Sequence, residues 1–244
     1  YAEENAVPVS IVIGMGTALG SHSGASPLAN MIADISGISG VCVTLPGGNE
    51  GGERLHFKGR NEGAEPVRAE IRTGRGAKGF TANVWSKAPY VYTVEIISPS
   101  GQVVGRIPAR NETTTLTFPF ENSTIYVYYR RYEGISGANL ITLRFAAPAE
   151  GIWVLNLYNN RDESGDVDVW IMNRTLIGDN VFFLTPDVYT TITDPGNLAS
   201  GITVSAYDYR DNSIYGDNGR GNNWYGILKP DFAAPGVDIM VPSY

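Results

Sequence analysis

The amino-acid sequence predicts an α/β + all-β chain, in which the two ends form a partial parallel-sheet core and the middle forms an inserted antiparallel β-sandwich. Strand and helix patterns alternate in the first 52 residues, and short runs rich in β-branched residues follow. Residues 53–185 hold 15 Lys+Arg against 14 Asp+Glu, whereas the remainder holds 3 against 11. We therefore expect three segments, 1–52, 53–185 and 186–244, with the middle one a separate module.

The first segment carries the pattern of a strand–helix–strand unit. Val7–Ile13 is a near-continuous apolar run, which is typical of a strand in a parallel sheet. Ser26 suits the N-cap of a helix and Pro27 its first position, and Gly37 is placed to end it. The apolar run Val41–Leu45 follows. Two strands joined by a helix predict a parallel pair with a right-handed crossover.

The middle segment consists of short strand-like runs separated by turn residues, and no long helical pattern competes with them. Such a series predicts an antiparallel sandwich, and a jelly roll in particular. The expected strands are Val67–Arg72, Phe80–Trp85, Tyr90–Ile97, Val103–Pro108, Thr113–Phe118, Thr124–Arg130, Asn139–Phe145, Gly151–Tyr158 and Val167–Ile171. In the last segment, residues 201–207 form one more apolar strand pattern, and the polar residues 208–223 predict a loop.

Composition argues against several classes of function. The net charge of −7 disfavours a nucleic-acid partner, and no apolar stretch is long enough to span a membrane. We expect no cofactor, because Gly20 follows Gly14-Met15-Gly16 one residue too late for a dinucleotide-binding motif. We assign no metal-binding residue, because the scattered Asp and Asn residues of 208–223 do not make a metal motif, and calcium binding is not predicted. The single Cys42 is expected to be a buried thiol, and both histidines, His22 and His56, are expected in loops. The oligomeric state is not predicted.

The glycine-rich turn after the strand at 41–45 is the strongest local signal for chemistry. It reads Pro46-Gly47-Gly48-Asn49-Glu50-Gly51-Gly52. Glycines let a ligand approach the backbone closely, and an Asn amide can donate a hydrogen bond to a developing oxyanion. The alternative is a plain turn, because Asn and Gly both tolerate left-handed backbone conformations.

Four pieces of sequence, in order, resemble motifs of the subtilisin-like serine proteases: Ser10–Gly16, Gly48–Gly51, Ile202–Ala206 and Lys229–Ile239. The closest resemblance is to a clostridial branch that includes the spore-germination proteases, since Gly20-Ser21-His22-Ser23-Gly24 is similar to a segment found there. Members of that branch carry a jelly-roll insertion where the expected sandwich falls. The resemblance covers only the two ends of the chain.

The resemblance implies a role for each matched residue. Asn49 would donate to the oxyanion, and Gly14-Met15-Gly16 would pair with the backbone of a polypeptide substrate. Pro46, Gly47 and Gly48 would form the opposite wall of the P1 pocket, which holds the substrate side chain before the scissile bond. The resemblance implies a bacterial protein that is secreted, in the cell envelope or spore-associated. Gly14 and Pro46 depart from the family pattern.

The family segments that carry the catalytic Asp, His and Ser do not match any part of the sequence. We therefore expect an internal fragment of a serine endopeptidase, inactive by itself. One alternative is a non-catalytic pseudoprotease. Another is that the sandwich binds glycans or proteins through its aromatic residues, or simply braces the core. The aromatic residues are Tyr126, Tyr128, Tyr129, Tyr132, Trp153, Tyr158 and Trp170.

Overall fold

The computed structural model describes residues 2–161 and 163–240. These residues divide into two compact units. Unit 1 combines the residues up to Glu53 with those from Val188 onward, and unit 2 is Arg54–Asp187. Each unit is described by itself below.

The expected fold class, α/β + all-β with a partial subtilisin-like parallel-sheet core, is wrong. The described residues are nearly all β, and two of their three sheets are antiparallel. An α/β fold joins its parallel strands by crossover helices. Here one helix of ten residues joins the first two parallel strands, and the later connections in unit 1 contain no described helix. The helices are α1 (Ala2–Asn5), α2 (Pro27–Ser36) and α3 (Arg174–Ile177).

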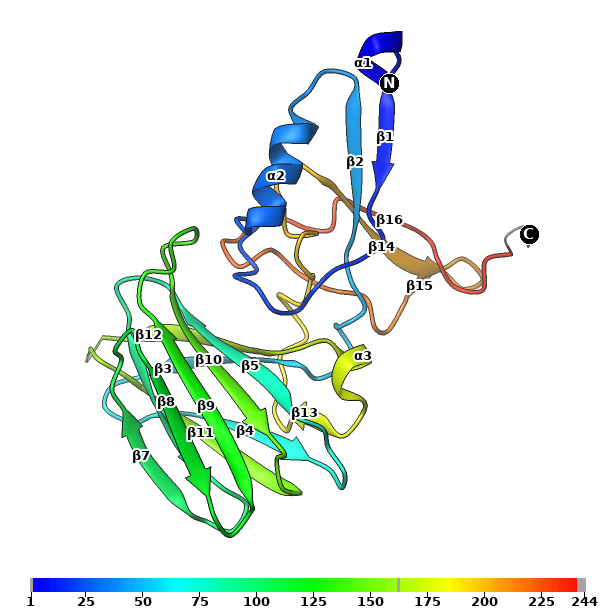
Figure 1. Cartoon of the computed structure of the whole chain (residues 1–244). Helices are drawn as coiled ribbons and strands as arrows, with labels where there is room; N and C mark the ends of the chain where they lie inside the picture. The colour runs from blue at the N-terminus through cyan, green and yellow to red at the C-terminus, as the bar shows by residue number, and fades with distance from the viewer. Residues whose placement is uncertain (1, 162, 241–244) are drawn as a thin grey trace. The chain divides into compact units, whose positions relative to one another are not determined.

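Unit 1 contains a five-stranded sheet in which β1, β2, β14 and β16 run parallel. Val9 pairs with Val41, and Ile202 pairs with Thr44. The short β15 lies antiparallel to β14. Figure 1 shows β1 and β2 side by side with α2 next to β2. The bounds are β1 Val9–Val12, β2 Val41–Pro46, β14 Ile202–Asp208, β15 Ser213–Ile214 and β16 Phe232–Pro235.

Helix α2 begins where the sequence predicts. The Ser26 side chain accepts a hydrogen bond from the backbone N–H of Ala29 at 3.0 Å, and Pro27 is the first helical residue. The buried face of the helix packs on β2 in a small core of Ala29, Ile32, Val43, Leu45 and Leu198.

The single cysteine is exposed, which corrects the expectation of a buried thiol. Side chains alternate between the two faces of a strand. Val43 and Leu45 of β2 belong to the core with α2, so the neighbouring Cys42 points to the other face of the sheet. Periodicity in an apolar run such as Val41–Leu45 does not reveal which of its two faces will be covered.

Unit 2 consists of two antiparallel sheets, of six and five strands. Each strand expected in this part of the sequence is present, with ends shifted by at most two residues. The six-stranded sheet has the order β3 (His56–Asn61), β12 (Gly165–Ile171), β5 (Phe80–Ser86), β10 (Asn139–Ala146), β9 (Ser123–Arg130), β8 (Thr113–Phe118). The five-stranded sheet has the order β13 (Val181–Phe183), β4 (Val67–Thr73), β11 (Gly151–Asn159), β6 (Tyr92–Ile97), β7 (Val103–Ile107).

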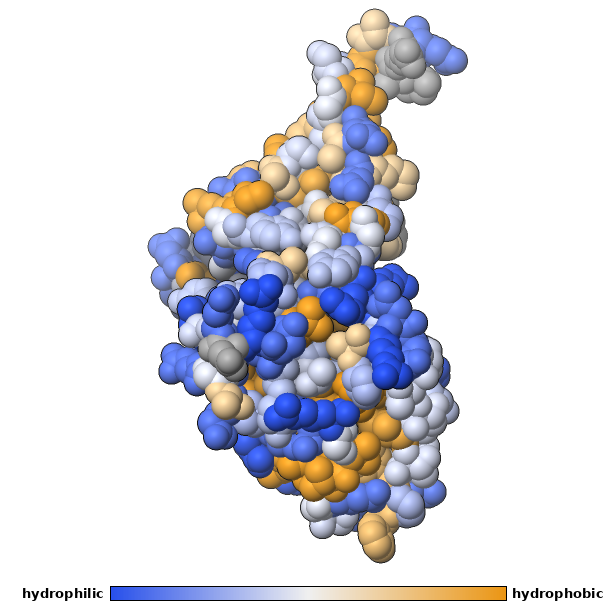
Figure 2. All heavy atoms as spheres, turned by 90° about the vertical axis from the view of Figure 1, so that its left-hand side faces the viewer, coloured by the Kyte–Doolittle hydropathy of each residue, from blue (hydrophilic) through white to orange (hydrophobic). Residues whose placement is uncertain are grey.

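One apolar core holds these two sheets together, because it takes side chains from the inward face of both. Trp153 lies at its centre, fully buried, with the rings of Phe118 and Phe145 edge-on at 5.1 and 5.5 Å. Its indole N–H donates to the carbonyl of Ala149 at 3.1 Å, so the polar atom is satisfied. Figure 2 shows hydrophilic residues interspersed with apolar ones on the part of unit 2 that faces the viewer.

Strand β3 was not expected, and it corrects the placement of His56 in a loop. His56 is the first residue of β3 and is 1% exposed. Its Nε2 lies 3.0 Å from a carboxylate oxygen of Asp168, and its ring stacks on Trp170 at 4.6 Å. Polar residues and Gly59 conceal the strand in the sequence. Glycine is required there because a Cβ would meet the Val67 side chain.

Among the described residues, no helix is long and apolar enough to cross a membrane.

Candidate functional site

The residues singled out from the sequence follow the carboxyl ends of neighbouring parallel strands. Gly14-Met15-Gly16 comes shortly after β1, and Pro46 ends β2 ahead of Gly47, Gly48 and Asn49. β1 and β2 are parallel neighbours, so both segments leave the sheet at the same edge. Open parallel sheets bind ligands at this edge, just beyond the strand ends.

An open pocket of about 260 Å³ lies at this edge. One side is made by the four residues Pro46–Asn49, and the others by β14, by the end of β16 and by Asn218. The lining is mostly backbone and small side chains, such as Ala206, Ala234 and Gly236. Such a surface lets another chain approach the protein backbone closely.

Asn49 occupies an exposed position in this lining. Its side-chain amide makes no hydrogen bond to the described part of the chain. The turn that carries it is held firmly, since Gly47 N–H donates to Val204 O at 2.9 Å and Gly219 N–H donates to Gly48 O at 2.8 Å. The backbone of the turn is therefore fixed, and the Asn49 amide in the pocket lining is left open to a ligand.

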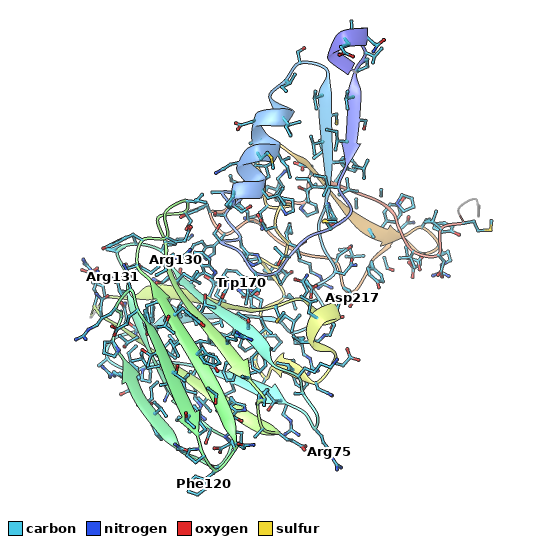
Figure 3. The ribbon with its side chains drawn as sticks, in the orientation of Figure 1. Arg75, Phe120, Arg130, Arg131, Trp170 and Asp217 are labelled. Atoms are coloured by element: carbon cyan, nitrogen blue, oxygen red, sulfur yellow. The ribbon has the colours of Figure 1, made fainter. Side chains whose placement is uncertain are left out.

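The loop around Asn218 packs against the turn that carries Asn49. The Asn218 side-chain oxygen accepts from Ala206 N–H at 3.0 Å, and its amide group donates to Ala206 O. Gly51 N–H donates to Asp217 O at 2.9 Å, and Figure 3 labels Asp217 in this loop. A Cβ on Gly52 would lie 2.6 Å from the Asp217 carboxylate. Gly51 and Gly52, the last glycines of the turn sequence, therefore allow the turn to pack closely against the loop around Asn218.

Thr193 joins the two glycine segments, and sequence reasoning missed it. Thr193 N–H donates to Gly47 O at 3.2 Å, and the next residue, Asp194, exchanges two backbone hydrogen bonds with Thr17 at 2.8 and 2.9 Å. The Thr193 side chain fills the space beside Gly16 and Gly48. The signal available in the sequence was the turn Asp194-Pro195-Gly196 that follows it.

Two further buried polar residues shape this region. His22 is buried, and its ring nitrogens lie 3.1 Å from Ile192 O and 2.9 Å from Ala18 O, which ties the loop after Gly16 to the segment before Thr193. Burial raises the pKa of the Asp194 carboxyl above its usual value, partly offset by a hydrogen bond from Ser26. Within residues 2–161 and 163–240, no three His, Cys, Asp or Glu side chains cluster to hold a metal.

Four of the seven aromatic residues singled out in unit 2 are buried or covered. Tyr129, Trp153 and Trp170 are buried, and Figure 3 labels Trp170. Arg106 covers the ring of Tyr158 at 3.5 Å. A sugar needs an open ring face to stack on, so these four aromatic residues serve packing. Tyr128 and Tyr132 are exposed.

No protein-family model matches the chain, and neither does any curated protein sequence. Among solved structures, the chain is similar to the structure of the Clostridium perfringens CspB protease, at 24% sequence identity and a TM-score of 0.87. The match covers 98% of this chain and 50% of that one, so the chain spans about half the length of the protein it resembles. The comparison therefore establishes a protease-like fold.

Proposed function

We propose that the chain is the substrate-binding and oxyanion-stabilising part of a subtilisin-like serine endopeptidase, related to the clostridial germination proteases. The observation that carries the proposal is the side-chain amide of Asn49. It is exposed, unpaired within the described chain, and mounted on a hydrogen-bonded turn at the carboxyl edge of a parallel sheet. The likeness to a protease over nearly the whole chain supports it.

Peptide-bond hydrolysis places negative charge on the oxygen of the scissile carbonyl when a nucleophile attacks its carbon. The Asn49 amide would donate a hydrogen bond to that oxygen. Because the backbone of the turn is fixed before substrate binds, only rotation of the Asn49 side chain is needed to bring the donor to that oxygen.

The polypeptide substrate would bind along the glycine segments. β1 is an edge strand of its sheet, and Met15, which follows it, is 73% exposed. An extended peptide can add to such an edge through backbone hydrogen bonds. Pro46, Gly47 and Gly48 would line the other side of the P1 pocket. We place the nucleophile, the base and the orienting carboxylate outside these 244 residues, consistent with a match that spans half of the similar protein.

The test is peptide hydrolysis by the full-length protein with Asn49→Leu, which keeps the size of the side chain and removes the donor. Loss of one oxyanion donor in a protease lowers kcat roughly 10²–10³-fold. We expect a fall of that order with KM nearly unchanged, because the donor acts on the transition state. Asn222→Leu is the matched control, since Asn222 is also exposed in unit 1 but lies outside the pocket lining.

An unchanged kcat in Asn49→Leu would remove Asn49 from this role. A full-length protein that hydrolyses no peptide at all would refute the enzymatic proposal and favour a non-catalytic relative.

A further inference from the structure

One face of the six-stranded sheet in unit 2 points away from the core. Successive residues of a strand point to opposite faces, and Leu116, Val127 and Leu143 of β8, β9 and β10 belong to the core. The alternate positions form the outward face, whose members include Thr113, Thr115, Thr117, Tyr126, Tyr128 and Arg144. No outward position of β8, β9, β10 or the neighbouring β5 holds an Asp or a Glu. Figure 1 shows β8, β9 and β10 side by side.

Arg144 supplies a positive charge on this outward face. It is exposed, and its guanidinium makes no ion pair or hydrogen bond with any residue that the structure describes. In the register of the sheet, Arg144 stands opposite Tyr126 on β9 and Thr81 on β5. Its guanidinium carbon lies 5.8 Å from the centre of the Tyr126 ring. The donors of the guanidinium are therefore available to a ligand beside an aromatic ring.

Two carboxylates lie on the same face of the next strand, β12, and both have partners nearby. The Asp166 carboxylate is 2.9 Å from the guanidinium of Arg60, and the Asp168 carboxylate is 3.0 Å from Nε2 of His56. Arg144 has no such partner among the described residues, so its charge is open to an external anion.

A pocket of about 360 Å³ opens beside Arg144. Thr81, Ala146, Met172 and Gly79 line it together with Arg144. The lining thus combines a guanidinium and a hydroxyl with apolar groups. A guanidinium binds a carboxylate through two parallel hydrogen bonds, so this pocket suits a carboxylate carried on a small ring or chain.

The groups on this surface suit a sugar better than a peptide strand. β9 and β10 are each paired on both edges, so they offer no free backbone groups to which an extended peptide could add. What they present are ring faces, hydroxyls and a guanidinium. Tyr128 is 39% exposed, and Thr113 and Thr115 of β8 are exposed next to the two tyrosines. Hydroxyls can both donate to and accept from the hydroxyls of a sugar, and aromatic rings offer broad apolar faces.

We propose that the outward face of β8, β9 and β10 binds a linear acidic glycan, a polysaccharide whose repeating units carry a carboxylate. Arg144 binds one carboxylate at the pocket, and Tyr126 and Tyr128 stack on neighbouring sugar rings. These tyrosines are two residues apart on one strand, a separation of about 7 Å. All of these residues belong to unit 2, so the proposal goes beyond the proposed function and does not depend on it.

Isothermal titration calorimetry of the 244-residue chain tests the proposal with three probes. Hexagalacturonic acid has sugar rings and carboxylates, maltohexaose has the rings alone, and hexaglutamate has the carboxylates alone. We expect hexagalacturonic acid to bind at least about tenfold more tightly than either of the others, because a hydrogen bond to a charged group adds about that much. Added salt should weaken this binding.

Two variants assign the binding to this face. Arg144→Gln should weaken hexagalacturonic acid binding by about tenfold or more, because the carboxylate loses its charged partner. Arg75→Gln is the matched control, since Arg75 (labelled in Figure 3) is exposed in unit 2 but lies outside the pocket lining, and it should leave the affinity unchanged. Tyr128→Leu keeps an apolar side chain without the ring and should weaken binding by about 2–10-fold.

Absence of binding of hexagalacturonic acid to the unaltered chain at millimolar concentration would overturn the proposal, and this measurement does not depend on the folding of a variant. Equal affinity for hexaglutamate would show attraction between charges alone and would overturn the assignment to a glycan. Equal affinity for maltohexaose would remove the role of Arg144. An equal loss in Arg144→Gln and Arg75→Gln would overturn the location of the site.

Discussion

Replacing Gly48 by Ala tests the packing on which the candidate site depends. Gly48 has a φ of +85°, where an L-residue is strained by about 1–2 kcal/mol. The new methyl would also lie 2.5–3.0 Å from three atoms of Thr193, and overpacking of this kind costs about 1–3 kcal/mol. We expect Gly48→Ala to lower the free energy of unfolding by about 2–5 kcal/mol.

Urea denaturation of the 244-residue chain, followed by circular dichroism, measures this loss. Hydrogen exchange of peptides from β2 and β14 assigns it to unit 1. Gly226→Ala is the matched control in the same unit, because Gly226 has a φ of +91° and nothing lies within 4 Å of the place its new methyl group would take. The control should therefore show the backbone strain alone, about 1–2 kcal/mol.

A second substitution isolates the contact itself. In a Thr193→Gly background the colliding side chain is gone, so adding Gly48→Ala to that variant should cost no more than Gly226→Ala costs in the wild type. If Gly48→Ala costs no more than Gly226→Ala, the reasoning that places Thr193 against this glycine is wrong.

Two further predictions concern the interior of unit 1. Leu45→Ala should lower the free energy of unfolding, measured by urea denaturation, by about 2–5 kcal/mol, because Leu45 is 1% exposed and packs under α2. Leu228 is 78% exposed, so the control Leu228→Ala should change it by less than about 0.5 kcal/mol. Equal losses in the two variants would contradict the assigned core. Burial raises the pKa of Asp194, so the folded state binds its proton more tightly than the unfolded chain and the carboxyl stabilises the fold least when ionised. Asp194→Asn should therefore gain stability over the wild type as pH rises from acid to neutral, measured by thermal unfolding, and a difference independent of pH would oppose this.

Local patterns in the sequence were sufficient for most of the individual elements. Helix α2 starts at Ser26-Pro27 because those residues satisfy its first turn by themselves. The strands of unit 2 alternate apolar and polar residues, and the structure buries the apolar set, as in β4. Strand β3 was missed because Gly59 and charged residues break that alternation.

The fold class was predicted wrongly because it depends on connections that have no local pattern. The strand–helix–strand signal of the first segment led to the assignment of an α/β class to both ends of the chain. The parallel pairing of β2 with β14 and of β14 with β16 instead uses connections that contain no described helix within unit 1. Strand pairing over long separations is set by packing, which a periodicity does not report.

The residues of the candidate site also fall into two groups, those that the sequence alone identifies and those that only the tertiary structure identifies. The glycine turn and Asn49 could be found from the sequence alone, because a strand followed by glycines and one amide has a local chemical meaning. Thr193 could not, because its neighbours Gly16 and Gly48 lie far from it along the chain and meet it only where the strand ends converge. The sequence by itself thus identified the turn and its single side-chain amide. The tertiary structure decided which side chain fills the space beside them, since only folding brings these three segments into contact.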